Sequence, residues 1–206
     1  MSQTVTYYFS LVSPWAFLGH AALMDVAKRH GAKVEYRPVF LGEVFPATGG
    51  LPLAQRAPAR QKYRFVELQR WREQRGIALN LRPKFWPLDI KPADQLVIAI
   101  CEAGLDPDAF MRAAFSASWC EERNIADDTV LAALLIQVNL DAGILAASKR
   151  DHIALAYRAN AQKAIAQDVF GSPSYIFNGE VFWGQDRLDL LESALAHNRP
   201  AYLPNA

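Results

Sequence analysis

The clearest β-strand patterns of this 206-residue chain lie near its two ends, and the residues between them are patterned as helices. The stretches TVTYYFS at 4–10 and KVEYRPV at 33–39 are rich in β-branched and aromatic residues. A helical pattern that ends at Gly31 joins them, which predicts a right-handed βαβ unit with parallel strands. Near the other end, SYIF and EVFWG flank Asn178-Gly179, a strong hairpin signal, and DRLDLLESALAHN predicts a last helix.

The middle of the chain shows no strand pattern of equal strength between residues 41 and 170. The segment 41–60 is rich in proline and glycine, so we expect a loop there. Helical patterns follow at 63–75, 93–103, 107–120, 127–138 and 149–166. The sequence therefore predicts an α/β fold in which residues 1–40 and 170–206 form one domain. Residues 41–169 form an inserted helical domain whose last helix leads back to the sheet.

Composition narrows the range of partners. The formal net charge is +1, which gives no basic excess to follow nucleic-acid phosphates. No apolar run approaches the ~18–20 residues needed to span a bilayer, and the N-terminal residues lack a signal-peptide pattern, so we expect a cytoplasmic protein without membrane contact. The four histidines are scattered without metal-ligand spacing, so no metal site is predicted.

Thiol chemistry of the chain itself is limited to two residues, Cys101 and Cys120. Their separation rules out a CxxC motif, and we expect both to be reduced thiols in a helical region.

Ser13 lies where the first strand gives way to the first helix, with Pro14 at the first helical position. Ligands of open α/β sheets bind at this edge, and free N–H groups at a helix start favour an anion. Ser13 can equally serve as a simple helix cap. Pro173, after Gly-Ser and before a strand, fits a cis peptide bond in a tight turn or an ordinary loop proline.

Five stretches of the chain resemble the 2-hydroxychromene-2-carboxylate isomerases and kappa-class glutathione transferases, which are relatives of the DsbA thiol oxidoreductases. They are FSLVSPWAFLG, RPVFLGEVFPATGG, RQKYRFVELQRW, ERNIADDTVLAALL and FGSPSYIFNGEVFWGQDRL. The resemblance implies a thioredoxin-like domain (βαβ…ββα) interrupted by a large all-helical insertion. It also implies a homodimer that binds glutathione between its two domains.

The same resemblance assigns roles to individual positions. The Ser13 hydroxyl would hydrogen-bond the glutathione sulfur and stabilise its thiolate. The backbone of Ser172, before a presumed cis Pro173, would pair with the cysteinyl part of glutathione. Gln185 and Asp186 would hold the γ-glutamyl end, and Asp186 could also cap the last helix. The predicted glutathione-binding set is Ser172, Pro173, Trp183, Gly184, Gln185 and Asp186, with Arg60 added as a basic residue near glutathione.

Three further predictions concern the substrate. Lys62 lies near Arg60 where the family carries basic residues, although either side chain could simply be solvated. Phe85 and Trp86, in LRPKFWPLD, could line a pocket for an aromatic acid or belong to a buried interdomain loop. Pro46 and Gly50 stand where related isomerases often have Lys and Asn, which weakens the assignment to the chromene substrate.

The leading hypothesis is an enzyme, a glutathione-dependent isomerase in which glutathione thiolate adds reversibly to a conjugated aromatic pyruvate and is then eliminated. The alternatives are a kappa-like transferase or peroxidase that consumes glutathione on electrophiles, and a noncatalytic thioredoxin-like binding module. Ser13 and Ala16 occupy the positions of the cysteine pair of a thiol oxidoreductase, which argues against dithiol–disulfide exchange.

Overall fold

The computed structural model describes residues 3–204 and contains one four-stranded mixed sheet. Its strand order is β2-β1-β3-β4. The strands are β1 (Thr4–Phe9), β2 (Lys33–Pro38), β3 (Ser174–Phe177) and β4 (Glu180–Trp183). β2 runs parallel to β1, whereas β3 is antiparallel to both β1 and β4. The predicted βαβ unit and C-terminal hairpin are therefore confirmed, and Asn178 and Gly179 both have positive φ.

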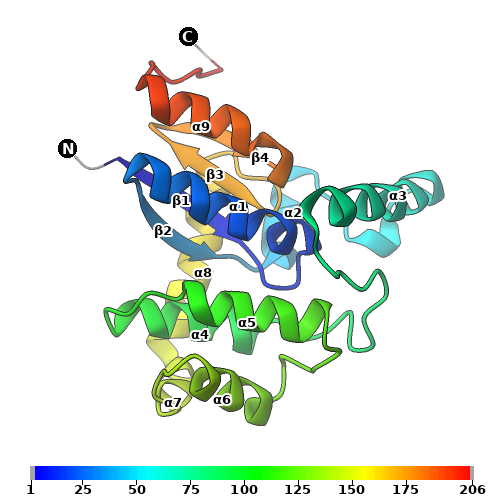
Figure 1. Cartoon of the computed structure of the whole chain (residues 1–206), viewed down its shortest axis with the longest axis vertical. Helices are drawn as coiled ribbons and strands as arrows, with labels where there is room; N and C mark the ends of the chain where they lie inside the picture. The colour runs from blue at the N-terminus through cyan, green and yellow to red at the C-terminus, as the bar shows by residue number, and fades with distance from the viewer. Residues whose placement is uncertain (1–2, 205–206) are drawn as a thin grey trace.

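Helices cover both faces of this sheet, as Figure 1 shows. α1 (Pro14–His30) and α9 (Leu188–His197) lie on one face, and their apolar residues pack against Tyr7, Phe9 and Tyr175. α8 (Asp151–Ala166) lies on the other face, where it contributes to a cluster with Tyr8 and Ile176. Successive residues of a strand point to opposite faces, so β1 supplies both clusters.

The residues between β2 and β3 are helical, and the five predicted helices are confirmed. They are α3 (Pro58–Arg75), α4 (Lys91–Glu102), α5 (Asp108–Trp119), α6 (Asp128–Gln137) and α8. A short helix that the sequence analysis did not predict, α7 (Ile144–Ser148), lies between α6 and α8. One cluster of buried side chains continues from Phe9 in the sheet to Phe115, Trp119 and Leu131 in the helices.

The expectation of a loop over 41–60 is wrong. Residues Leu41–Thr48 form α2, and Leu53–Gln55 form a short 3-10 helix, η1. Leu41 and Val44 pack into the cluster that α8 forms behind the sheet. This burial outweighs the local signal of Pro46, which lies inside the helix although it has no N–H to donate.

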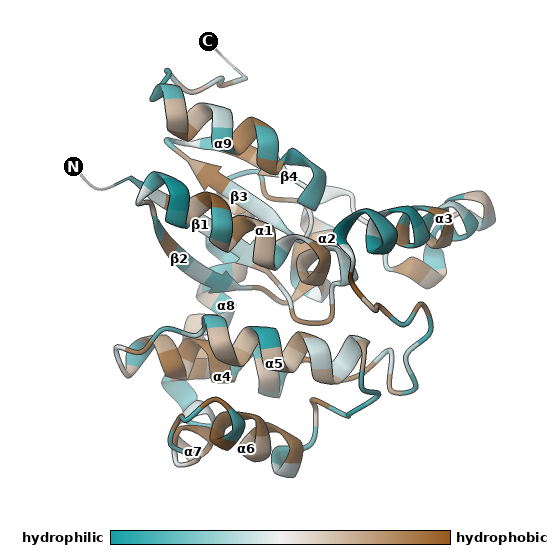
Figure 2. Cartoon of the chain, in the orientation of Figure 1, coloured by the Kyte–Doolittle hydropathy of each residue, from teal (hydrophilic) through white to brown (hydrophobic). Residues whose placement is uncertain are grey.

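Hydrophobic and hydrophilic residues are unevenly distributed among the helices (Figure 2). α3 is largely hydrophilic, whereas α6 is mostly hydrophobic. Within residues 3–204, no helix has both the length and the apolar character required to cross a bilayer.

Candidate functional site

Ser13 joins two segments that are far apart in the sequence. Its Oγ accepts a hydrogen bond from the N–H of Ala16 at 3.2 Å, which makes Ser13 the N-cap of α1. The same hydroxyl donates to the backbone carbonyl of Ser172 at 3.0 Å, and both residues are buried. The peptide bond from Ser172 to Pro173 is cis. The start of α1 and the start of β3 therefore meet at one end of the sheet (Figure 1).

A second contact fixes the same junction. The N–H of Ser10 donates to the Oγ of Ser172 at 3.0 Å. The backbone N–H groups of Ser172 and Trp15 make no hydrogen bond within the described part of the chain. Two unpaired N–H donors beside a buried hydroxyl at a helix N-terminus can bind an anion or an extended peptide.

Asp94 belongs to the helical segment and holds the loop before Ser13 through hydrogen bonds. It lies in the first turn of α4 and is fully buried. Its Oδ1 accepts from the N–H of Leu11 at 3.0 Å, and its Oδ2 accepts from the hydroxyl groups of Ser10 at 2.9 Å and Tyr157 at 2.7 Å. Burial raises the pKa of Asp94 to about 7, although these three hydrogen bonds act in the opposite direction.

Sequence reasoning missed both Asp94 and Tyr157. Asp94 lies in the first turn of α4, before the apolar run LVIAIC, where an acidic residue is ordinary, so neither residue carried a distinct local signal.

The end of β4 approaches the same junction through its backbone. The N–H of Gly184 donates to the carbonyl of Pro173 at 2.9 Å, and Gly184 has a φ of 107°. The next residue, Gln185, begins the 3-10 helix η2 (Gln185–Arg187) and is buried. The structure therefore brings Ser13, Ser172, Pro173, Gly184 and Gln185 to one end of the sheet.

Two residues outside the predicted set lie against Gln185, one through hydrogen bonds and the other through close packing. The guanidinium of Arg75, at the end of α3, donates to Gln185 Oε1 from Nε at 3.3 Å and from Nη2 at 3.1 Å, and to its carbonyl at 3.2 Å. Gly19 of α1 lies so close that a Cβ there would be 2.7 Å from Gln185 Cβ and 2.9 Å from the Tyr175 hydroxyl. Neither residue carried a local sequence signal for this role.

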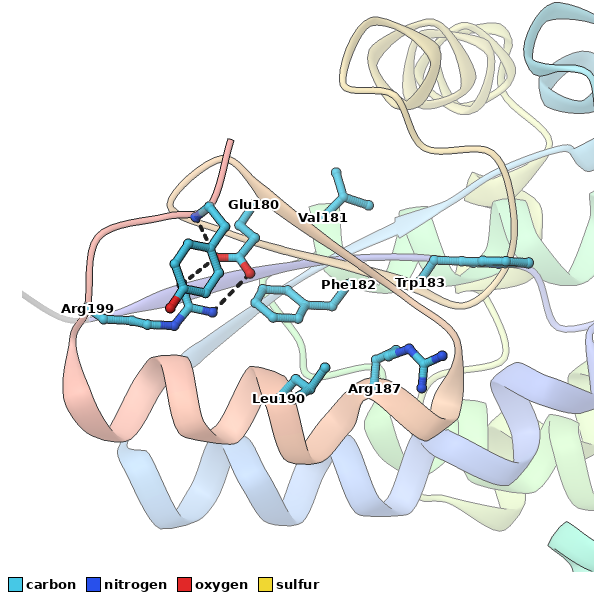
Figure 3. A pocket seen from close by; sticks show the side chains of 8 residues that line it. Glu180, Val181, Phe182, Trp183, Arg187, Leu190 and Arg199 are labelled. Carbon is cyan, nitrogen blue, oxygen red and sulfur yellow. Dashed lines mark hydrogen bonds and ion pairs between the residues drawn. The ribbon is translucent and has the colours of Figure 1, made fainter. Parts of the chain in front are cut away.

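Asp186 and Trp183 lie nearer the surface. The Asp186 carboxylate is exposed and forms an ion pair with Arg187 at 2.9 Å. The Trp183 side chain is 51% exposed, packs edge-on against Phe170, and lies over Gly171. It borders a pocket of about 310 Å³ between β4 and α9, shown in Figure 3.

The remaining predicted residues belong to α3 and to its connection with α4. Arg60 and Lys62 are exposed on α3 and form no ion pair within residues 3–204. Phe85 and Trp86 are half-buried in the connection, and the peptide bond from Trp86 to Pro87 is cis. None of these four side chains is hydrogen-bonded to the group around Ser13 in the described residues.

Two comparisons with known proteins agree with this geometry. Residues 4–196 match the family model of the DSBA-like thioredoxin domain. A 2-hydroxychromene-2-carboxylate isomerase of Sphingobium xenophagum is 31% identical over 198 residues, which cover 95% of this chain and 99% of the relative. The chain belongs to the DsbA-like thioredoxin family and, within it, to the 2-hydroxychromene-2-carboxylate isomerases.

Two further comparisons extend the relationship. A 2-hydroxychromene-2-carboxylate isomerase of Pseudomonas putida is 29% identical over 203 residues, or 93% of each chain. The solved structure of a 2-hydroxychromene-2-carboxylate isomerase superposes with a TM-score of 0.78 at 25% identity and covers 95% of both chains. The predicted family and fold are confirmed, and this DsbA-like chain is an enzyme of an isomerase family.

The thiols of this DsbA-like chain do not form a redox pair at the start of α1. Cys101 and Cys120 are free and half-buried in other helical regions. Burial raises the pKa of the Cys101 thiol to about 11, and it also raises the pKa of Cys120. Both groups are therefore protonated near neutral pH, which is the less nucleophilic state of a thiol.

Proposed function

We propose that this chain is a glutathione-dependent isomerase that acts on an aromatic pyruvate of the 2-hydroxychromene-2-carboxylate type. The observation that carries the proposal is the hydrogen bond between the Ser13 hydroxyl and the Ser172 carbonyl at 3.0 Å. These are the two groups that the family resemblance assigns to the sulfur and to the cysteinyl backbone of glutathione. In the protein alone they satisfy each other.

The unpaired groups around this bond suit a peptide-like thiol. The N–H of Ser172 has no acceptor within residues 3–204, so it can donate to a ligand carbonyl as an added strand would require. If the Ser13 hydroxyl turns toward a sulfur, the Ser172 carbonyl becomes free to accept from a ligand N–H. One rotation of the Ser13 hydroxyl would thus supply two of the contacts that the ligand needs.

Glutathione, when bound, supplies the thiolate that adds to and leaves the conjugated substrate. The chain favours the anionic state of that sulfur in three ways. The Ser13 hydroxyl donates a hydrogen bond, the Trp15 N–H is unpaired among the described residues, and the N-terminus of α1 carries partial positive charge. Burial of Ser13 strengthens these interactions, because they act away from bulk water.

The loop that carries Ser13 needs a fixed position for this chemistry. Asp94 accepts hydrogen bonds from Ser10 and Leu11, so the helical segment holds this loop in addition to the contact with Ser172. Such preorganisation matters because a misplacement of about 1 Å can cost on the order of 100-fold in rate.

Calorimetric titration with reduced glutathione tests the proposal, with Ser13→Ala and the exposed Ser193→Ala as a matched pair. We expect saturable binding by the wild type and Ser193→Ala. With Ser13→Ala we expect binding but a loss of the ultraviolet absorbance of the bound thiolate. Turnover of the chromene substrate should require glutathione and return it unchanged. Stoichiometric loss of glutathione would indicate a transferase instead, and no binding at millimolar glutathione would contradict the proposal.

A further inference from the structure

The segment from 51 to 91 is strongly basic in a chain of almost neutral charge. It contains ten Lys or Arg residues against three Asp or Glu, whereas the whole chain has a net charge of +1. Three of its arginines, Arg56, Arg64 and Arg82, form no ion pair in the described part of the chain. Instead, each guanidinium lies over an aromatic ring.

Arg64 is the most enclosed of these three arginines. Its guanidinium carbon lies 5.4 Å from the ring centre of Trp86 and 5.8 Å from that of Phe65. It makes no hydrogen bond within residues 3–204. Burial, together with the charge of Arg56, lowers the pKa of Arg64 to about 10. A guanidinium removed from water without a counter-charge is unfavourable, so a bound anion would stabilise this arrangement.

The surroundings of Arg64 indicate what kind of anion fits. The guanidinium of Arg82 lies 5.0 Å from the ring centre of Phe65, so two cations share one aromatic ring. The indole Nε1 of Trp86 is buried and has no acceptor among the described residues. Aromatic walls with guanidinium donors suit a planar group that ends in a carboxylate, which can accept two parallel N–H bonds.

The segment from 51 to 91 is connected to the Ser13 site at two points, through Asn80 and through Arg75. The N–H of Asn80, in the connection after α3, donates to the carbonyl of Trp119 at 2.7 Å. The indole of Trp119 donates in turn to the carbonyl of Leu11 at 3.3 Å. The end of α3 holds Gln185 through Arg75. In Figure 1, α3 lies beside the end of the sheet at which α1 begins.

We propose that Arg64, with Trp86 and Phe65 as aromatic walls, binds the carboxylate of the electrophilic substrate. The inference rests on the proposed function, because it assigns a subsite to the second substrate of that reaction. Arg82 adds a second positive charge at the same place. The glycine carboxylate of glutathione has the same chemistry, so the test must separate the two sources.

The first experiment uses binding in the absence of glutathione. The probe is 2-hydroxycinnamate, a stable aromatic carboxylate, followed by tryptophan fluorescence and calorimetry, with its amide as the neutral control. We expect Arg64→Met to weaken binding of the acid by roughly 10-fold or more, since a charge-assisted hydrogen bond is lost. Arg64→Lys keeps the charge but lacks the planar guanidinium. Its affinity for the acid should lie between those of the wild type and Arg64→Met. The control is Arg70→Met, because Arg70 is exposed on the same helix and paired with Glu67.

The second experiment titrates the same variants with glutathione. We expect Arg64→Met to bind glutathione as the wild type does and to raise the KM for the carboxylate substrate. Weaker glutathione binding with unchanged binding of 2-hydroxycinnamate would identify the glycine carboxylate as the ligand and overturn the proposal. Equal binding of the acid by wild type and both Arg64 variants would also overturn it. If the wild type binds no glutathione, the proposed function fails, while the 2-hydroxycinnamate titration still tests Arg64.

Discussion

Ser13 and Ser172 lie 159 residues apart in the chain, and one hydrogen bond of 3.0 Å joins the hydroxyl of the first to the carbonyl of the second. The hydroxyl also caps α1, so a single side chain serves a helix, a strand junction and the proposed ligand site. Its removal should therefore affect stability and thiolate formation together.

Replacement of Ser13 by Ala should lower the free energy of unfolding by about 1–3 kcal/mol. The N-cap contributes about 1 kcal/mol, and the buried Ser172 carbonyl loses its donor. Denaturant titration measures this loss, with the exposed Ser193→Ala as the control. If Ser13→Ala is as stable as the control, the hydrogen bond to Ser172 does not contribute to the folded state.

Asp94 should increase the free energy of unfolding as pH falls, which is the reverse of the usual effect of a carboxyl group. Its pKa is about 7 in the folded protein against an ordinary value of 3.8. Between these values the folded protein holds a proton that the unfolded chain has released. The free energy of unfolding contributed by Asp94 therefore rises as pH falls from about 7 to about 4, by on the order of 4 kcal/mol.

The measurement compares wild type with Asp94→Asn, which has no titrating group at this position. The difference between their unfolding free energies should shift in favour of the wild type as pH falls through this range. Parallel curves would mean that Asp94 is ionised throughout. Other titrating groups cancel in the difference because both proteins share them.

Gly19→Ala should destabilise the protein although alanine is the better helix former. A Cβ at this position would lie 2.7 Å from Gln185 Cβ and 3.3 Å from Gln185 Cα, so α1 and η2 must separate. We expect a loss of about 1–3 kcal/mol from this overpacking, and weaker glutathione binding because Gln185 moves. Helix propensity alone predicts a gain of up to about 1 kcal/mol, so the sign of the measured change decides between the two effects.

Arg75→Met should reduce glutathione affinity several-fold, on the order of 1 kcal/mol, because Gln185 loses its hydrogen bonds from the guanidinium. Arg70→Met, on the same helix but paired with Glu67, is the matched control. Calorimetry of both variants checks the prediction. Equal affinities would show that Gln185 keeps its position without Arg75.

The two cysteines should react slowly with an aromatic disulfide reagent at neutral pH in the native protein. Burial raises the pKa of Cys101 to about 11 and also raises that of Cys120, so little thiolate is present. Reaction should become rapid on unfolding. Fast reaction of the native protein, or reduction of insulin disulfides by it, would support an oxidoreductase activity.

Local sequence signals correctly predicted the helix and hairpin that surround the site. The N-cap at Ser13, the helix end at Gly31 and the hairpin at Asn178-Gly179 each depend on a few neighbouring residues. α2 was missed because its stability comes from packing of Val44 against the cluster behind the sheet, despite Pro46. In such cases tertiary contacts override local propensity.

The supporting contacts of the site could not be found in this way. Asp94 with Tyr157, and Arg75 with Gln185, are pairs separated by 63 and 110 positions in the chain. No local pattern encodes such a pair, because each partner alone is compatible with an ordinary helix position. The family resemblance supplied the predicted ligand positions, but it did not supply the residues that contact them.

The strand order β2-β1-β3-β4 has a consequence for synthesis of the chain on the ribosome. β1 and β2 can pair as soon as the first forty residues have emerged, but the second edge of β1 has no partner until β3, at Ser174–Phe177, is made. For most of translation that edge, with backbone N–H and C=O groups that have no strand partner, resembles the open edges at which strands of different chains associate. The helices between β2 and β3 are all synthesised before β3, and α8, the last of them, ends at Ala166, so the junction of Ser13 with Ser172 forms only after these helices have emerged.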